Sequence, residues 1–294
     1  MAIYEEVLNQ LRNINVWNYG DRSAKSAEPA ALCSLALTGD GHFDEAEESL
    51  NWLAEIQTKS GGVTVDGDSS SPNWPTGLAI LAWHHWDRVS GSTKFATNIE
   101  RAISWLLKTE GTTIPPDEAK HIGHDTTLVG WPWVVGTHSW IEPTAISALA
   151  LRTMDLADHI RVTDAIELLI DRQLPQGGCN YGNTFILGQR LRPHIQPTGW
   201  AMLALRGVAS TEKIKKSLTF LRRSLSSRLS LVSASFAILG LNAHYELNEQ
   251  QNNASQRQLL ETLSRQAVES SNAYQLSLFA HAYQGSKSLL LFGS

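Results

Sequence analysis

A short segment near the middle of the chain gathers residue types that can carry acid–base chemistry beside aromatic rings. His138 lies four residues before Glu142, and Trp131, Trp133 and Trp140 lie with them in the string GWPWVVGTHSWIEPT. Burial among indole rings raises the pKa of a carboxyl group toward that of a general acid, and a histidine can relay a proton. We therefore take Glu142 and His138 as candidate catalytic residues.

Other candidates lie outside this segment. Asp68, in VDGDSSSPNWPT, is a third candidate acid, although a turn residue beside Gly67 is the simpler interpretation. Indole and phenol rings can line an apolar pocket or stabilise a cation. The candidate ligand-binding residues are Trp17, Trp74, Trp131, Trp133, Trp140 and Tyr181.

Each candidate has a structural alternative. The tryptophans could fill a core, and His138 could be only hydrogen-bonded. Glu142 could be the N-cap of a helix, where the helix dipole favours a carboxylate. In HIGHD, His121, His124 and Asp125 have metal-ligand types without a metal-site spacing, so the sequence predicts no metal and no cofactor.

The elements that must position these residues are internal repeats. Four segments align on a proline: EPAALCSLAL, WPTGLAILAW, EPTAISALAL and QPTGWAMLAL, beginning at residues 28, 74, 142 and 196. Two degenerate copies without proline, SASFAILGL and AYQLSLFAH, follow. Because proline lacks an N–H, we expect each proline to be the first residue of a helix.

The six repeated segments are apolar on nearly all sides, which predicts buried helices. Six amphipathic segments alternate with them, beginning with IYEEVLNQLRNI and ending with SQRQLLETLSRQ. This alternation predicts an all-α fold, an (α/α)6 toroid of six helical hairpins forming a single domain over residues 1–294. The inner helices of a closed toroid run the same way, so the candidate residues would meet at one rim. An open solenoid is the alternative.

The outer segments end in a motif that extends this inference. It reads Trp52-Leu53-AEI-Gln57-TKS-Gly61-Gly62 in one copy and LLIDRQLPQGG, over residues 168–178, in another. This pattern resembles the repeat of squalene-hopene-cyclase-like proteins in the terpenoid cyclase/protein prenyltransferase superfamily. The resemblance implies the double ring of helices and speaks for fold more than for activity.

The sequence departs from the catalytic motifs of that superfamily. Its cyclases protonate substrates with a DxDD motif, but the nearest string here, Asp66-Gly67-Asp68-Ser69, lacks the last aspartate. The sequence holds no DDxxD magnesium motif, and neither Cys33 nor Cys179 has the aspartate of the prenyltransferase zinc site. The known chemistries are therefore not carried over.

Two functions remain open. The first is a biosynthetic, terpenoid-cyclase-like enzyme that acts on a small hydrophobic molecule, such as an isoprenoid with an anionic head group, in a central aromatic-lined cavity. Its chemistry would be of acid–base or cation type, such as cyclisation. The alternative is a non-catalytic ligand-binding or protein-interaction module that keeps the ring. The oligomeric state does not follow from the sequence.

Composition excludes several classes. Lys and Arg are outnumbered 24 to 29 by Asp and Glu, which argues against a nucleic-acid partner. No apolar run reaches the 18 or so residues of a membrane helix, and the first residues lack a signal-peptide pattern. With only two cysteines, a cytoplasmic location is the expectation.

Overall fold

The chain is almost entirely helical. The computed structural model describes residues 2–20, 24–226, 228–244, 252–270 and 272–291. Within them lie twelve α-helices and one two-stranded antiparallel sheet, in which Phe185 pairs with Arg190 and Ile186 with Gln189. Within the described residues, no helix is both long and apolar enough to cross a membrane.

The helices alternate between two kinds, as the repeats predict. The even-numbered helices are buried on nearly all sides; in α2 every residue from Ala27 to Thr38 is buried. The odd-numbered helices are amphipathic, and α9 buries one stripe of Ile214, Ser217, Leu218 and Leu221. Small residues and an apolar circumference let the first kind pack on several neighbours at once.

The contacts of the chain divide it into two compact units. Unit 1 comprises Met1–Leu106, Ser226–Ser235 and Gln250–Gly293, and unit 2 comprises Leu107–Leu225 and Phe236–Glu249. The helices of unit 1 are α1 (Ala2–Asn13), α2 (Ala27–Gly39), α3 (Phe43–Glu55), α4 (Thr76–Ser90), α5 (Ala96–Lys108), α11 (Asn252–Ser270) and α12 (Ala273–Gln284), followed by the 3-10 turns η2 (Gly285–Lys287) and η3 (Leu289–Leu291). The last two residues of α5 belong to unit 2. That residues 1–294 form a single domain stays a prediction.

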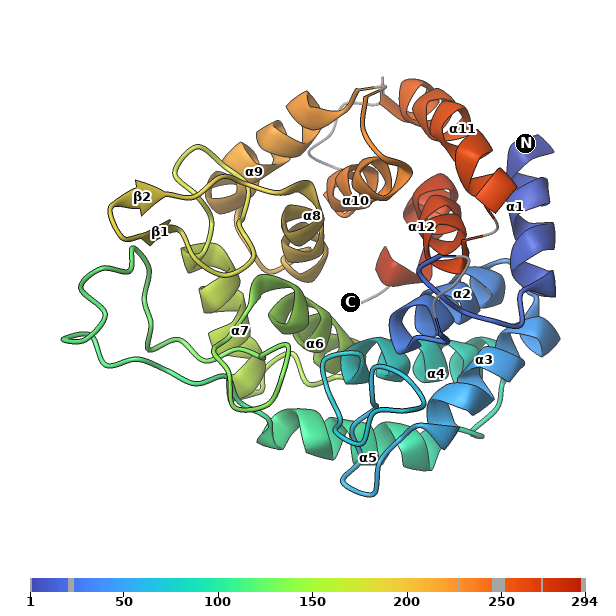
Figure 1. The fold of residues 1–294 in the computed structure, drawn as a ribbon, viewed down its shortest axis with the longest axis horizontal. Helices are drawn as coiled ribbons and strands as arrows, with labels where there is room; N and C mark the ends of the chain where they lie inside the picture. Colours follow the sequence, from blue (N-terminus) through green and yellow to red (C-terminus); the bar gives the residue numbers. More distant parts are fainter. Residues whose placement is uncertain (1, 21–23, 227, 245–251, 271, 292–294) are drawn as a thin grey trace. The chain divides into compact units, whose positions relative to one another are not determined.

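Unit 2 holds fewer helices and longer connections. Its elements are α6 (Ile141–Thr153), α7 (Ile160–Asp171), β1 (Phe185–Ile186), β2 (Gln189–Arg190), α8 (Ile195–Ala204) and α9 (Thr211–Ser224). Helix α10 (Leu231–Asn242) contributes its last seven residues to this unit and its first five to unit 1. In unit 1, α2 packs against α3, α4 and α12; in unit 2, α6 packs against α7 and α8 (Figure 1).

The helix starts differ in detail from the expectation. Pro29, Pro143 and Pro197 are each the third helical residue, and Pro75 is an N-cap, so placing every proline first was wrong. The missing N–H still costs nothing, because the first four N–H groups of a helix lack intrahelical acceptors. Glu142 is not an N-cap, because α6 begins at Ile141: Trp140 is the N-cap, and Glu142 is the second helical residue.

Candidate functional site

The Gly-Gly turns that follow α3 and α7 are built by the same backbone contacts. Thr58 N–H donates to the Gly62 carbonyl at 2.9 Å, and Leu174 N–H donates to the Gly178 carbonyl at 2.8 Å. Their first glycines have φ of 104° and 96°, where a side chain would be strained. A Cβ at either would lie 2.2 or 2.3 Å from a carbonyl of the following outer helix. Glycine is therefore required at Gly61 and Gly177.

A threonine at the start of the next inner helix anchors three of the repeats. The Thr76 hydroxyl accepts the Val63 N–H at 2.9 Å, Thr144 accepts the Trp131 N–H at 2.9 Å, and Thr198 accepts the Cys179 N–H at 2.8 Å. All three bonds are buried. The Pro-Thr dipeptide thus fixes a residue that follows a loop glycine (Gly62, Gly130 or Gly178) to the helix after that loop.

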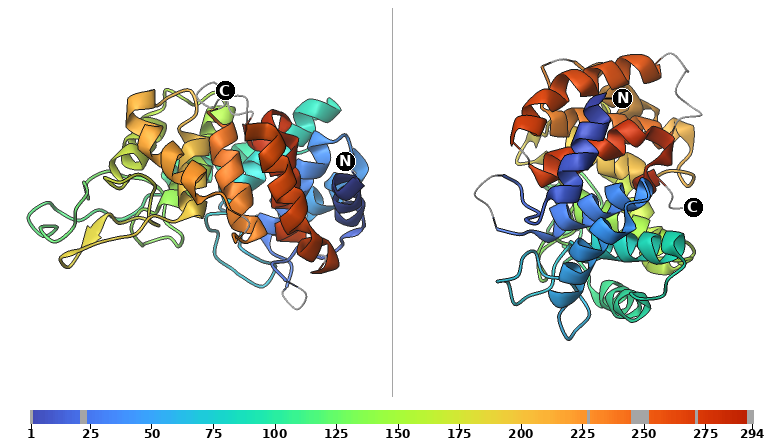
Figure 2. Two further views of the ribbon diagram at one scale, coloured as in Figure 1. Left: turned by 90° about the horizontal axis from the view of Figure 1, so that it is seen from above. Right: turned by 90° about the vertical axis from the view of Figure 1, so that its right-hand side faces the viewer.

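Two long connecting segments of unit 2, which precede α6 and α8, are called the insertions. The first is the segment between α5 and α6, residues 109–140. Two backbone hydrogen bonds close it on itself: Gly111 N–H donates to the Gly130 carbonyl at 3.0 Å, and Thr112 N–H donates to the Thr137 carbonyl at 2.9 Å. The β1–β2 hairpin lies beside it, since Gly123 N–H donates to Phe185 O at 3.2 Å. Figure 2 shows both extending from the helices of unit 2.

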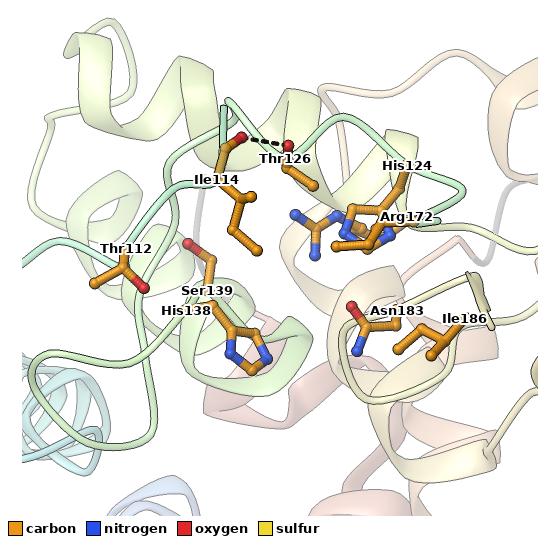
Figure 3. Close-up of a pocket in the computed structure, with 10 residues that line it drawn as sticks. Thr112, Ile114, His124, Thr126, His138, Ser139, Arg172, Asn183 and Ile186 are labelled. Carbon is orange, nitrogen blue, oxygen red and sulfur yellow. Dashed lines mark hydrogen bonds between the residues drawn. The ribbon is translucent and has the colours of Figure 1, made fainter. Parts of the chain in front are cut away.

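A pocket of about 140 Å³ lies between these two insertions and the end of α7. One part of its lining is aliphatic and the other part carries hydroxyl, amide, imidazole and guanidinium groups (Figure 3). The lining residues are Thr112, Ile114, Ile122, His124, Thr126, His138, Ser139, Arg172, Asn183 and Ile186. Among the catalytic and ligand-binding candidates of the sequence analysis, only His138 is in this lining.

Arg172 supplies the positive charge of the pocket. It follows the last residue of α7, is 4% exposed, and directs its guanidinium toward the middle of the lining residues (Figure 3). Its N–H groups donate to the carbonyls of Gly182 and, at 3.4 Å, Asp125. Asp171 Oδ2 lies 3.6 Å from Nε. Burial lowers the pKa of Arg172 to about 10, which leaves it cationic at neutral pH.

The two histidines of the pocket are held neutral. Burial, followed by the charge of Arg172, lowers the pKa of His124 to about 4 and the pKa of His138 below its usual value. Neither His124 Nδ1 nor His138 Nε2 has a hydrogen-bond partner among the described residues. A neutral imidazole with an unused nitrogen can accept or donate a proton.

Several predicted residues do gather at the start of α6. The His138 ring lies 4.3 Å from that of Trp140, and Ile141 N–H donates to the Tyr181 carbonyl at 2.8 Å. Glu142 follows, 3% exposed, within the first turn of α6. The Tyr181 side chain is 41% exposed and packs on the His194 ring at 4.9 Å. The catalytic and binding roles of these residues stay predictions.

Two of the predicted ligand-binding rings have structural contacts. Trp131 is 1% exposed, and the guanidinium of Arg161 lies 4.2 Å from its ring centroid. Trp17 is 2% exposed, and its ring lies 5.8 Å from that of Trp52 in unit 1. Cation–π and ring packing of this kind stabilise a core, and a ligand role for either ring stays a prediction.

The remaining candidates are more exposed. Asp68 is an exposed turn residue of unit 1, whose N–H donates to Asp66 Oδ1 at 3.1 Å. This contact matches the turn interpretation, and an acid role stays a prediction. Trp74 in unit 1 and Trp133 in unit 2 are half-buried. Among the described residues, no group of three His, Cys, Asp or Glu side chains is placed to hold a metal ion, His121, His124 and Asp125 included.

Sequence reasoning missed Arg172, Ser139 and Asn183. A signal for Arg172 exists in the repeat itself, because the position before the motif glutamine is Ile56 in one copy and Arg172 in the other. A charged residue at a position that is apolar in the other Gly-Gly copy marks a difference between these two copies. No comparable sequence signal marks Ser139 or Asn183.

Comparison with known proteins shows the fold but no family. No protein-family model and no curated protein matches the sequence. Among solved structures, an alpha-1,6-mannanase from Salegentibacter is similar over 98% of this chain and 99% of its own, with a TM-score of 0.66 at 11% identity. The chain therefore has the (α/α)6 toroid fold that the repeats predict.

Other similar structures are also enzymes. The type II terpene cyclase MstE from Scytonema is similar over 91% of this chain and 77% of its own, with a TM-score of 0.58 at 13% identity. An endo-1,4-D-glucanase from Vibrio fischeri covers 93% of this chain and 92% of its own, with a TM-score of 0.64 at 10% identity. The resemblance to terpenoid cyclases is thus one of several, and these identities speak for fold alone.

Proposed function

We propose that the protein is an enzyme that carries out acid–base chemistry on a small molecule bound in the pocket of unit 2. The observation that carries this proposal is the state of His138. Its imidazole is half-buried and neutral, and its Nε2 has no hydrogen-bond partner among the described residues. His138 and Arg172 line the same pocket. As a neutral imidazole, His138 would accept a proton from the substrate and return it to the product, which leaves the protein unchanged at the end of the cycle. Glu142, buried four residues later in the first turn of α6, is the proposed second group.

The size of the pocket limits the substrate. A cavity of about 150 Å³ holds a molecule as large as benzene, so this pocket of about 140 Å³ suits a group of about six heavy atoms. An isoprenoid would place only one branched, five-carbon end there, against Ile114, Ile122 and Ile186. The proposed reaction is a cyclisation or a related proton-driven step at that end.

The test is turnover of a defined panel. Short isoprenoid acids, alcohols and diphosphates are incubated with the wild-type protein and with His138→Gln and Glu142→Gln, and products are followed by mass spectrometry. We expect the wild type to convert at least one member, with a loss of about 100-fold or more in each variant. Unchanged turnover in both variants would remove these residues from the mechanism.

A second candidate function is a non-catalytic ligand-binding module. The burial of Trp17 and Trp131 in structural contacts favours it, because these rings pack within their units. This alternative expects the panel to contain a ligand that binds without being converted. Conversion of any member that depends on His138 contradicts it.

A further inference from the structure

We infer that the pocket of unit 2 is a binding site for a small monocarboxylate, with the carboxylate on Arg172 and Ser139 and the hydrocarbon part against Ile114, Ile122 and Ile186. This inference names the ligand class of the site in the proposed function and rests on that proposal only for the choice of site. Binding can be measured without turnover, so the two can fail separately.

The hydrogen-bond donors of the buried Arg172 are incompletely used within the protein. Two of its N–H groups donate to the Gly182 and Asp125 carbonyls. Its Nε has no hydrogen-bond acceptor among the described residues, and the nearest carboxylate oxygen, on Asp171, lies beyond hydrogen-bond distance at 3.6 Å. That same oxygen already accepts the Asp125 N–H at 3.0 Å. Arg152 and Arg161 also have an Nε without an acceptor among the described residues, but neither lines the pocket. At Arg172 an anionic ligand in the pocket could supply the missing acceptor.

Hydroxyl and amide donors lie in the same lining. Ser139 Oγ accepts the Gly130 N–H at 2.8 Å, which leaves its own O–H proton to donate to a ligand. The Asn183 amide faces the pocket (Figure 3). The Thr126 hydroxyl already donates to the Ile114 carbonyl at 2.6 Å, so its proton is not offered to a ligand.

The charge balance favours a monoanion. Arg172 is the single guanidinium or ammonium group in the lining, and both lining histidines are neutral. Asp125 and Asp171 lie close enough to influence the pKa of Arg172, and their carboxylates would repel a second negative charge. A carboxylate carries one charge and suits a planar guanidinium, whereas phosphate carries up to two at neutral pH.

The aliphatic part of the lining selects for a short hydrocarbon. Ile122 and Ile186 are joined by an isolated antiparallel bridge, so the two insertions present their isoleucines together. The volume of about 140 Å³ leaves room for about six heavy atoms in all. A branched acid such as 3-methylbutanoate, with five carbons and two oxygens, is close to the upper limit of this volume and has the right chemistry for both parts, whereas acetate would leave the isoleucines uncovered.

The first experiment compares probes and variants by calorimetric titration. The probes are 3-methylbutanoate, its neutral amide, acetate and inorganic phosphate. We expect 3-methylbutanoate to bind at least tenfold more tightly than the other three, and Arg172→Gln to lose at least tenfold in affinity. Arg152→Gln is the matched control, because Arg152 is a buried arginine that donates to two backbone carbonyls, of Ala204 and Arg206, outside the pocket lining.

A second measurement needs no variant and stands if Arg172→Gln fails to fold. Histidine C–H resonances are titrated with pH in the presence and absence of 3-methylbutanoate. A bound carboxylate favours the protonated imidazole, so the pKa values of His124 and His138 rise. His85 and His281, buried in unit 1, are internal controls whose titration is expected to stay unchanged.

Several results would overturn the inference. These are equal binding of the acid and its amide, unchanged affinity in Arg172→Gln, tighter binding of phosphate, or histidine pKa values that do not respond to the acid. Binding of the carboxylate without any conversion would instead leave the inference standing and count against the proposed enzyme. Conversion of a neutral substrate without any binding of the carboxylate would support the proposed enzyme and overturn the inference of a carboxylate site.

Discussion

The Gly-Gly turns after α3 and α7 share their backbone contacts and differ in what they carry. In both turns the motif glutamine forms an isolated antiparallel β-bridge with the residue that follows the second glycine. The pairs are Gln57 with Val63 and Gln173 with Cys179. Only the second turn continues into a β hairpin, and only it is preceded by an arginine, where the first has Ile56. Repeated contacts thus hold the fold, and the candidate site is built from departures from the repeat.

The largest expected effect tests whether the two turns are equivalent. Gly61→Ala and Gly177→Ala each place a Cβ against a backbone carbonyl at positive φ, which we expect to lower the free energy of unfolding by about 4 kcal/mol. Urea denaturation measures this. Gly67→Ala, which meets no atom within 4 Å, is the control and should change stability by less than about 0.5 kcal/mol. A large effect at one glycine only would break the equivalence.

The second prediction compares the starts of α2 and α6. Glu28 accepts a hydrogen bond from the Tyr19 hydroxyl, and burial raises its pKa to about 7. The folded state therefore holds a proton that the unfolded state has lost, and stability falls as pH rises from about 4.5 to 7. Glu28→Gln, which mimics the protonated form, should raise the unfolding free energy at pH 8 by about 3 kcal/mol and change it little at pH 4.

Thermal melts of Glu28→Gln across this pH range measure the effect. The paired Glu142→Gln variant shows whether burial at this shared position of the helix is sufficient for the effect, or whether it is particular to Glu28. Equal stabilisation at pH 4 and pH 8 would contradict a protonated Glu28.

The third prediction concerns the threonine anchors. Thr76→Val, Thr144→Val and Thr198→Val each leave a buried N–H without its acceptor, at an expected cost of about 2 kcal/mol. The corresponding serine variants keep the hydroxyl and serve as controls in the same denaturation series. If one valine variant were as stable as its serine partner, that anchor would not contribute to its turn.

The smallest expected effect separates the histidines of the two units in acid. Burial lowers the pKa of both His124 and His281 to about 4. Between pH 6.5 and 4 the unfolded state therefore binds more protons than the folded state, and the free energy of unfolding decreases as the pH is lowered through that range. His281 is fully buried and His124 is only half-buried, so solvent reduces the contribution of His124. His124→Gln should slightly reduce the decrease of Tm on acidification, and His281→Gln should reduce it more. A larger reduction in His124→Gln than in His281→Gln would contradict this order.

Much of the fold follows from particular residues of the sequence. The proline-anchored segments and the charged, amphipathic segments between them predict the alternation of helices, because burial on all sides and burial on one stripe leave different patterns. The exact helix starts did not follow, since a proline is tolerated anywhere in the first turn. His138 was predicted from its neighbours Trp140 and Glu142, whereas Ser139, beside it in the chain, carried no distinguishing signal.

The sequence by itself determined the all-α repeat and placed several candidate residues near the start of α6. Only the tertiary structure decided that His138 shares a pocket with Arg172, 34 residues away in the chain. The reason is physical: helical periodicity is local, but the pocket forms where two insertions of unrelated length meet. Their meeting depends on backbone contacts such as that of Gly123 with Phe185, which leave no periodic pattern in the sequence.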